Sequence, residues 1–389
     1  MRLLPILAAS CFVSSMSMRI LDPVVPDIAR DLAVAPEAVA LLASAFAFPY
    51  ALGQPVLGAL GDAIGKSKII KITLAMLVVC LAAGFLAPSL DALLITRVIG
   101  GAAAGGIIPL AFALVGDRFD MADRQWALSR VLTAIIAGQM TGSIGSGVVA
   151  SMFGWRVSML TGTLLAAAAL AVTLWQLHPK PRANRPAFQI SNLFRGYGDV
   201  FRNPRTVVCF TAVFVEGIVV FGAIPYIAVL LEQRGAGGLK EAGFVLAGFA
   251  FGGFSYIALV RVMLDKLGLY NLIRSGAAIA GLGFAAMSLA VSWPVEMLIM
   301  FVIGLGFYMI HNSLQTQATE LAPNNRASAV AAHAFFFFLG QAAGPLVYRL
   351  GFHFTGQDTT FVAAGIVMAL TGLATAAGLK MRSGSRAPP

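Results

Sequence analysis

Long apolar runs separated by short polar stretches fill almost the whole chain. The runs at 69–87 and 157–177 are typical, and each has about the 20 residues that an α-helix needs to cross a bilayer. A strand of a membrane barrel needs only about 10 residues that alternate between apolar and polar, and these runs do not alternate. A helix also satisfies its own backbone hydrogen bonds, which lipid cannot do. The pattern therefore predicts an all-α membrane protein.

Polar gaps and prolines divide the apolar sequence into twelve predicted transmembrane helices. Their limits are 4–26, 37–60, 69–87, 91–114, 126–149, 157–177, 205–231, 241–260, 271–291, 295–319, 327–349 and 359–379. An even number of crossings places both ends of the chain on the same side of the membrane. The first run resembles a signal peptide, but it lacks a convincing cleavage site and further spans follow, so we keep it as the first helix.

The composition supports a lipid environment. Hydrophobic residues make up 59% of the 389 residues and charged residues only 11%, whereas a soluble domain carries about 25% charged residues. Too few charges remain to cover a surface in water, so the lipid bilayer is an expected partner. The net charge of +10 is not gathered on a soluble module and does not indicate nucleic acid. The three cysteines lie in apolar runs and are expected as reduced, packing thiols.

Basic residues are concentrated on one side of the predicted membrane. The side that holds both chain ends contains 20 of the 27 lysines and arginines, and the other side contains 5. The acidic residues are divided almost evenly, 7 against 8. Lysine and arginine, but not acidic residues, favour cytoplasmic loops. Both termini are therefore predicted to be cytoplasmic, in the inner membrane of a bacterium.

The longest polar gap, about 178–204, lies between the sixth and seventh predicted helices. Its prolines and arginines are typical of a cytoplasmic linker. It separates two predicted six-helix bundles, at 1–177 and 205–380, and residues 381–389 form a polar tail that is expected to be disordered.

Short motifs of the first half of the sequence recur in the second half, 202 residues later. GQMTGS at 138–143 corresponds to GQAAGP at 340–345, and Pro23 corresponds to Pro225. An arginine precedes both the fifth and the eleventh helix at the same spacing. Matches at one spacing, each at the equivalent place in its half, predict two pseudo-symmetric bundles, which is a known transporter architecture.

A polar, glycine-rich stretch, GALGDAIGKSK at 58–68, follows the second predicted helix, and a weaker copy follows the eighth. The stretch resembles the signature loop of the major facilitator superfamily, G-x-L-x-D-R-x-G-R-K, with Ala63 in place of the first basic residue. The resemblance extends over the chain through the number of spans and the two halves. It implies a secondary transporter, not an enzyme, that works by rocking two six-helix bundles around a central site.

The resemblance also implies a role for this loop. In the family it is thought to latch the two halves in the outward-facing state through charge and helix-end contacts, with glycines that allow a tight turn and a close helix approach. Here Asp62 would pair with Arg124 or Arg130. The predicted latch residues are Gly58, Asp62, Gly65, Lys66, Arg124 and Asp265. The alternative is that the lysines only anchor the topology.

Three further stretches resemble parts of exporters of this superfamily. Residues 93–106 resemble a fourth-helix motif with a membrane arginine, here Arg97, and residues 306–323 resemble the tenth helix of arabinose-efflux-like members. The glycine-rich fifth helix resembles the motif of drug–proton antiporters, although Ser143 and Ser146 replace its proline and a glycine. The resemblance implies export of a small organic or drug-like molecule in exchange for protons, and the two replacements keep uptake open.

Four charged residues, Arg19, Asp22, Arg97 and Glu216, lie inside predicted helices, where each costs about 2.5–3.5 kcal/mol. At about 1.5 Å per residue, Asp22 and Arg97 lie at similar depths, so Asp22 can pair with either arginine. A carboxyl group that alternates between an arginine and a proton suits proton coupling, and a static pair that fixes packing is the alternative. Glu216 is expected to bind a proton or a cationic substrate near the midplane, or only to hydrogen-bond to another helix.

Polar and aromatic residues complete the predicted site. Histidines can titrate or bind substrate, amides can line a cavity or bridge helices, and one or two of the phenylalanines at 335–338 are expected to face a cavity. The predicted substrate-binding residues are His311, Asn312, Gln315, His333, Gln139, Gln341 and Phe337. For each of them, ordinary helix packing is the alternative.

Other function classes lack their motifs. The sequence contains no G-x-x-x-x-G-K-[ST], no H-E-x-x-H and no Cys-x-x-Cys, so we expect no ATP-driven pump, no metal site and no cofactor. The preferred function is proton-coupled export by a monomer, with a small molecule and protons as partners. Uptake of a metabolite or metal complex, by symport or uniport, is the first alternative. A membrane sensor or assembly factor that transports nothing is the second, and it would not need the buried carboxyl groups.

Overall fold

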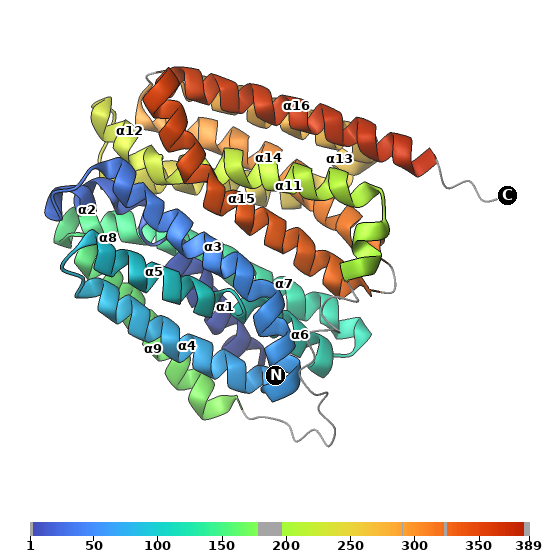
Figure 1. Ribbon diagram of the computed structural model, residues 1–389, viewed down its shortest axis with the longest axis horizontal. Helices are drawn as coiled ribbons and strands as arrows, with labels where there is room; N and C mark the ends of the chain where they lie inside the picture. Colours follow the sequence, from blue (N-terminus) through green and yellow to red (C-terminus); the bar gives the residue numbers. More distant parts are fainter. Residues whose placement is uncertain (1–2, 178–196, 290, 323–324, 385–389) are drawn as a thin grey trace. The chain divides into compact units, whose positions relative to one another are not determined.

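The computed structural model describes residues 3–177, 197–289, 291–322 and 325–384, and every regular element within these ranges is helical (Figure 1). This confirms the predicted all-α fold. The elements of the first half are α1 (Leu3–Arg19), η1 (Asp22–Val24), α2 (Val25–Asp31), α3 (Pro36–Leu60), η2 (Gly61–Gly65), α4 (Lys66–Phe85), α5 (Leu90–Ala104), α6 (Ile107–Arg118), α7 (Met121–Met140), η3 (Thr141–Gly145), α8 (Ser146–Phe153) and α9 (Trp155–Gln176). Those of the second half are α11 (Arg205–Ala223), η4 (Ile224–Tyr226), α12 (Ile227–Gln233), α13 (Leu239–Ala286), α14 (Trp293–Leu321), α15 (Arg326–Thr355) and α16 (Gln357–Gly384).

The chain divides into two compact units, which we call the N-unit and the C-unit. The N-unit comprises residues 1–190 with 238–243, and the C-unit comprises residues 191–237 with 244–389. Each unit is described by itself below.

Both halves of the chain begin with a helix that is broken at the same place. The short 3-10 segments η1 and η4 start 202 residues apart, and each contains a proline, Pro23 or Pro225. Proline has no N–H to donate to the carbonyl group four residues earlier, so a regular α-helix cannot continue through it. The first helix therefore changes to η1 after Arg19, and its counterpart changes to η4 after Ala223. The break recurs at the spacing of the sequence repeat.

Eleven helical segments within the described residues are long and apolar enough to cross a membrane. Ten of them each correspond to one predicted helix, and α13 covers the predicted helices 241–260 and 271–291. Its 48 residues are too long for one crossing at about 1.5 Å per residue. Gly268, with φ 67° and ψ 168°, interrupts its helical geometry. The number of twelve crossings stays a prediction, with Gly268 as the point where α13 would divide.

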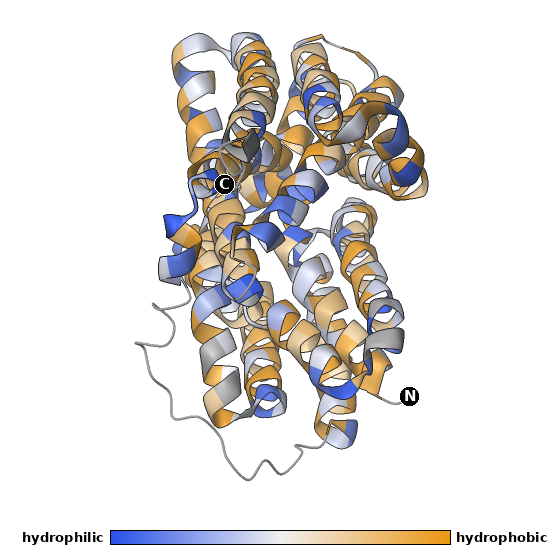
Figure 2. Ribbon diagram, turned by 90° about the vertical axis from the view of Figure 1, so that its right-hand side faces the viewer, coloured by the Kyte–Doolittle hydropathy of each residue, from blue (hydrophilic) through white to orange (hydrophobic). Residues whose placement is uncertain are grey.

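Large apolar side chains are exposed along the helices, and Figure 2 shows hydrophobic residues on the ribbons of both units. Val79 and Leu164 in the N-unit, and Leu282 and Leu370 in the C-unit, each have more than half of their surface exposed. Soluble monomers rarely expose apolar surface on this scale. Contact with lipid chains accounts for it, as expected of a protein with many membrane-spanning helices.

Glycines let helices within each unit approach to backbone contact at repeated positions. A Cβ atom on Gly138 would lie 2.2 Å from the carbonyl oxygen of Phe12, and one on Gly340 would lie 2.1 Å from that of Phe214. Both members of the second pair follow the first by 202 residues. Because no side chain fits at either glycine, α7 lies directly on α1, and α15 lies directly on α11. The two units therefore share a packing scheme as well as a helix order.

The polar stretch at 58–68 is a tight helical connection. It continues α3 through the π-helical segment η2 to Gly65, whose φ of 120° turns the chain into α4. The predicted tight turn is thus at Gly65. A Cβ atom on Gly58 would meet no atom within 4 Å, so the helices do not approach closely at this glycine. Close packing occurs instead at Gly61, where a Cβ atom would lie 2.2 Å from Leu110.

An arginine–aspartate pair joins the end of α2 to the start of α9 in the N-unit. Arg156 forms an ion pair with Asp31 and also donates a hydrogen bond to the carbonyl oxygen of Ala87, at 3.0 Å, in the connection between α4 and α5. The indole N–H of Trp155 donates to Asp31 at 3.0 Å. We call Asp31 and Arg156 the N-unit clasp, since they hold three segments together.

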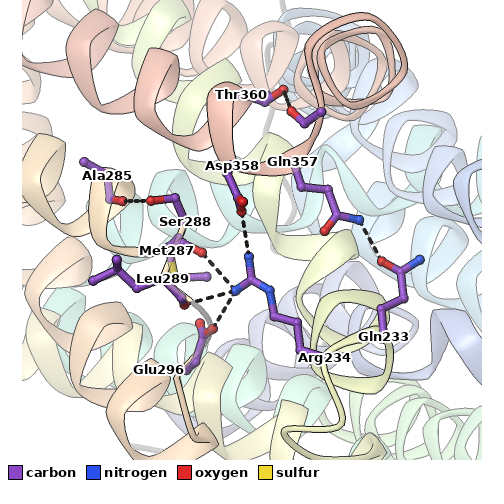
Figure 3. Close-up of polar contacts among 11 residues, drawn as sticks. Gln233, Arg234, Ala285, Met287, Ser288, Leu289, Glu296, Gln357, Asp358 and Thr360 are labelled. Atoms are coloured by element: carbon purple, nitrogen blue, oxygen red, sulfur yellow. Dashed lines mark hydrogen bonds and ion pairs between the residues drawn. The ribbon is translucent and has the colours of Figure 1, made fainter.

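Ion pairs also join the corresponding segments of the C-unit, but the acidic and basic residues have exchanged places (Figure 3). Arg234, directly after α12, donates to the carboxylates of Glu296 at 3.1 Å and Asp358 at 3.4 Å, which lie at the starts of α14 and α16. It also donates to the carbonyl oxygen of Met287 at 2.9 Å. Asp358 follows Arg156 by 202 residues. We call Arg234, Glu296 and Asp358 the C-unit clasp. Its arginine follows α12, the counterpart of α2, whereas the arginine of the N-unit clasp lies on α9.

Candidate functional site

The buried charges of the N-unit lie at the break in its first helix. Arg97 on α5 donates to the carbonyl oxygen of Ser17 at 2.7 Å and to that of Met18 at 3.4 Å. Carbonyl groups at the end of a helix have no partner within the helix, and the guanidinium group supplies donors for two of them. Its carbon also lies 4.0 Å above the centre of the Phe46 ring. Arg97 is thus held in place by backbone and ring contacts, with 3% of its surface exposed.

Asp22 pairs with the arginine of its own helix. Nη1 of Arg19 lies 3.4 Å from Oδ2 of Asp22, and both side chains are buried. Of the two pairings that the sequence left open, this is the one that the structure forms. Arg97 lies close enough to both groups to interact with them electrostatically. The cluster holds two guanidinium groups for one carboxyl group.

The buried carboxyl group of the C-unit meets a histidine from a different helix. Oε2 of Glu216, on α11, lies 2.9 Å from Nδ1 of His311, on α14, and the two share a hydrogen bond. Only 1% of the surface of Glu216 is exposed. The ring of His333, on α15, follows at 5.3 Å from that of His311, measured between centroids. Three helices thus bring one carboxyl group and two imidazole groups together.

Aromatic rings enclose this polar cluster. The ring of His311 stacks on Phe307 at 5.0 Å with an interplanar angle of 17°, and it lies 4.4 Å from Phe337. Phe221 contacts Phe249 at 5.8 Å and Phe337 at 5.4 Å. The aromatic cage, as we call Phe221, Phe249, Phe307 and Phe337, draws on α11, α13, α14 and α15. Its rings fix the orientation of the His311 imidazole and surround the cluster with apolar surface.

Two polar atoms in this cluster have no hydrogen-bond partner among the described residues. They are Oε1 of Glu216 and Nε2 of His333. Both residues are almost fully buried, at 1% and 2% exposure. An unsatisfied buried polar atom costs about 1–3 kcal/mol, so native structures rarely keep one without a use. Single buried atoms without a partner also occur in the N-unit, Oγ of Ser15 and Nε of Arg97 among them, whereas here two lie in one cluster.

The remaining predicted substrate residues occupy varied surroundings. Asn312 is half-buried beside His311 in the sequence, whereas Gln315, one turn further along α14, is exposed. Gln341 is buried on α15, one turn after Phe337. Gln139 is half-buried on α7 in the N-unit. Within the described residues, no group of three or more histidine, cysteine, aspartate and glutamate side chains is arranged to hold a metal ion.

The predicted latch residues are partly described. The side chain of Asp62 lies outside the described side chains. Lys66 forms an ion pair with Asp117 at 2.7 Å, and Arg124 donates to the carbonyl oxygen of Gly116 at 2.8 Å. Asp265 is exposed on α13. The contacts that the structure records for Lys66 and Arg124 thus join the starts of α4 and α7 to the end of α6 within the N-unit.

Sequence reasoning missed the C-unit clasp and most of the aromatic cage. Glu296 was not recognised as a buried charge, although it is only 2% exposed, because it lies close to the predicted helix start. An acidic residue two positions after Pro294, with apolar residues following it, was the available signal. For Phe221, Phe249 and Phe307 there was no signal, because phenylalanine is common throughout these helices.

Comparison with known proteins gives consistent results. The family model of the Major Facilitator Superfamily matches residues 7–345. The multi-drug resistance efflux pump PmrA of Streptococcus pneumoniae is 26% identical over 373 residues, with 92% of each chain covered. Multidrug resistance protein 1 of Bacillus subtilis is 21% identical, with 88% of each chain covered. The uncharacterised transporter YybF of Bacillus subtilis is 24% identical, covering 86% of this chain and 83% of the relative.

Solved structures show the same fold at low sequence identity. The nucleoside transporter NupG superimposes with a TM-score of 0.77 at 15% identity, covering 97% of this chain and 98% of NupG. The human organic anion transporter MFSD10 (TETRAN) gives a TM-score of 0.71 at 16% identity, covering 96% and 99%. Together with the helical membrane fold and the match over residues 7–345, these similarities place the protein among transporters and not enzymes. The chain therefore belongs to the Major Facilitator Superfamily.

Proposed function

We propose that the protein exports a small organic or drug-like molecule by alternating access, in exchange for protons. The observation that carries the proposal is the Glu216–His311 contact of 2.9 Å inside the aromatic cage, with one carboxylate oxygen left without a partner. A carboxyl group in such a place can exchange a proton for a cationic group of the substrate. The efflux pumps among the relatives support the direction of transport.

In this mechanism, Glu216 is the principal proton-binding group, and Asp22, paired with Arg19, is a second. Arg97 is a positioning residue, because it holds the end of α1 on which that pair lies. The proposed substrate contacts in the C-unit are His311, His333, Phe337, Asn312, Gln315 and Gln341, and Gln139 is the proposed contact in the N-unit. The predicted latch, the cytoplasmic termini, the inner-membrane location and the monomeric state remain parts of the same proposal.

Proteoliposomes with an imposed pH gradient test the proposal directly. Purified protein is reconstituted, and the flux of a fluorescent organic cation such as ethidium is followed with the gradient in either direction and with none. We expect a flux that follows the gradient and is lost in Glu216→Gln. The matched control is Glu320→Gln, which removes an exposed carboxyl group from the same helix as His311. Flux that ignores the gradient would exclude proton coupling.

Uptake is the rival function, and one observation favours it. Where drug–proton antiporters have proline in the fifth helix, this chain has Ser143, and the helix continues through the π-helical segment η3. The proteoliposome measurement separates the two, because substrate moves with the proton in symport and against it in antiport. A flux along the direction of the proton gradient would therefore assign uptake.

A further inference from the structure

The composition of the C-unit cluster restricts the charge of its ligand. Glu216 is its acidic group, and the partner that the structure records for it is the imidazole of His311. With both imidazoles neutral and the carboxyl group ionised, the cluster carries one negative charge. The faces of the aromatic cage add to this preference, since the face of a ring attracts cations. A cation is therefore favoured over an anion of the same shape.

The two unpartnered atoms restrict the ligand further. Oε1 of Glu216, as part of a carboxylate, can only accept a hydrogen bond, and Nε2 of His333 can accept or donate one according to its tautomer. A ligand that satisfies Oε1 must bring an N–H or O–H group. A quaternary nitrogen carries no such hydrogen and would leave the oxygen unpaired. The side chain of His311 is the most exposed of the three, at 15%, so the ligand would reach these two atoms past His311.

We propose that the C-unit binds amines in their protonated form and selects them by the N–H group that they donate to Glu216. The second contact is Nε2 of His333, which faces a further polar group of the ligand. This inference rests on the proposed function and narrows its substrate class. It distinguishes N–H cations from permanently quaternary cations of the same size and charge.

A matched pair of dyes tests the selection. Acridine orange, protonated at its ring nitrogen, is a planar monocation whose N–H group lies on that nitrogen, and its ring-N-methyl derivative is a planar monocation with a methyl group there. Binding of each dye to the full-length protein in lipid nanodiscs is measured by fluorescence polarisation at neutral pH, without a gradient. We expect the N–H dye to bind about 10-fold more tightly or better, as one unsatisfied buried acceptor implies.

Variants assign the preference to the two atoms. Glu216→Gln should weaken binding of both dyes and reduce their affinity ratio towards one, and His333→Phe should lower the affinity for the N–H dye. Glu320→Gln should leave the ratio unchanged. Equal affinity of the wild-type protein for both dyes, or no binding of either, would overturn the proposal without use of any variant. A failure of proton coupling would appear instead as a gradient-independent flux, so the two proposals fail separately.

Discussion

The two units hold their buried charges by different contacts on one helical scaffold. In the N-unit, Arg97 is bonded to the carbonyl oxygens of Ser17 and Met18 and lies on a ring. In the C-unit, Glu216 has one partner, His311, and one oxygen with none. The first arrangement holds the end of a helix, and the second leaves one carboxylate oxygen without a hydrogen-bond partner. The two halves of a duplicated fold thus carry these buried charges at different positions and with different contacts.

The divergence is visible residue by residue. Glu216 follows Ser14 by 202 residues, and Ser14 donates a hydrogen bond to the carbonyl oxygen of Ala104 at 3.2 Å. Conversely, Met300 follows Arg97 by 203 residues, the spacing between the starts of α5 and α14. Each unit therefore carries its buried charge where the other has an uncharged residue. The backbone that the units share does not require either charge, so each charge has to be explained by the contacts within its own unit.

The largest expected effect is the loss of transport in Glu216→Gln. Glutamine keeps the shape of the side chain and can still hydrogen-bond to His311, so the unfolding free energy should change by less than about 1 kcal/mol. It cannot exchange a proton, so gradient-driven flux should fall to the background of protein-free liposomes. Thermal unfolding of the same preparation gives the stability. A variant that is less stable but retains flux would show that Glu216 has a structural role instead.

The two clasps should differ in strength, although they join corresponding segments. Arg234→Ala leaves the buried carboxyl group of Glu296 without its charged partner and should cost about 3–5 kcal/mol. Arg156→Ala removes the charged partner of Asp31, whose side chain is already 42% exposed. It should lower the free energy of unfolding by about 1 kcal/mol or less. Thermal unfolding in detergent measures both. Adding Glu296→Gln to Arg234→Ala should restore part of the lost stability, because the buried carboxyl group is then uncharged. If no stability is restored, the broken Arg234–Glu296 pair is not the cause of the loss.

Replacing Arg97 by the methionine of the matching C-unit position tests whether its role is structural. Arg97→Met leaves the carbonyl oxygens of Ser17 and Met18 without donors but no longer buries a guanidinium group. We expect a loss of about 2–3 kcal/mol of unfolding free energy. Arg130→Met, at an exposed arginine, is the control. Unchanged stability with loss of flux would instead make Arg97 part of the transport mechanism.

The sequence predicted the helices, their break and the repeat because these depend on local properties. Apolar runs of sufficient length and the prolines at 23 and 225 act on the backbone around them, whatever packs nearby. The partners of the buried charges depend on how each helix is rotated and how closely it packs. Glu216 and His311 are 95 residues apart in the chain, and no pattern near either residue indicates the other.

The same distinction explains the remaining differences. Both pairings of Asp22 were consistent with depth along the helix, and only the contact of Arg97 with backbone oxygens decided between them. Gly58 belongs to a recognisable motif, yet the open space around it follows from packing that the motif does not specify. Residue type and spacing therefore located the charges, whereas the function of each depends on contacts between helices.

The smallest expected effect concerns the shared scaffold itself. Gly138→Ala and Gly340→Ala would each push a Cβ atom against a carbonyl oxygen, of Phe12 and of Phe214, at nearly the same distance. Each should cost about 1–3 kcal/mol of unfolding free energy, and the two costs should agree because the packing is repeated. Gly58→Ala, with no atom within 4 Å of its Cβ, should instead stabilise α3 by about 0.5–1 kcal/mol. Thermal unfolding of the three variants measures these differences. A large disparity between the first two would mean that the units have diverged in their backbone packing as well as in their charges.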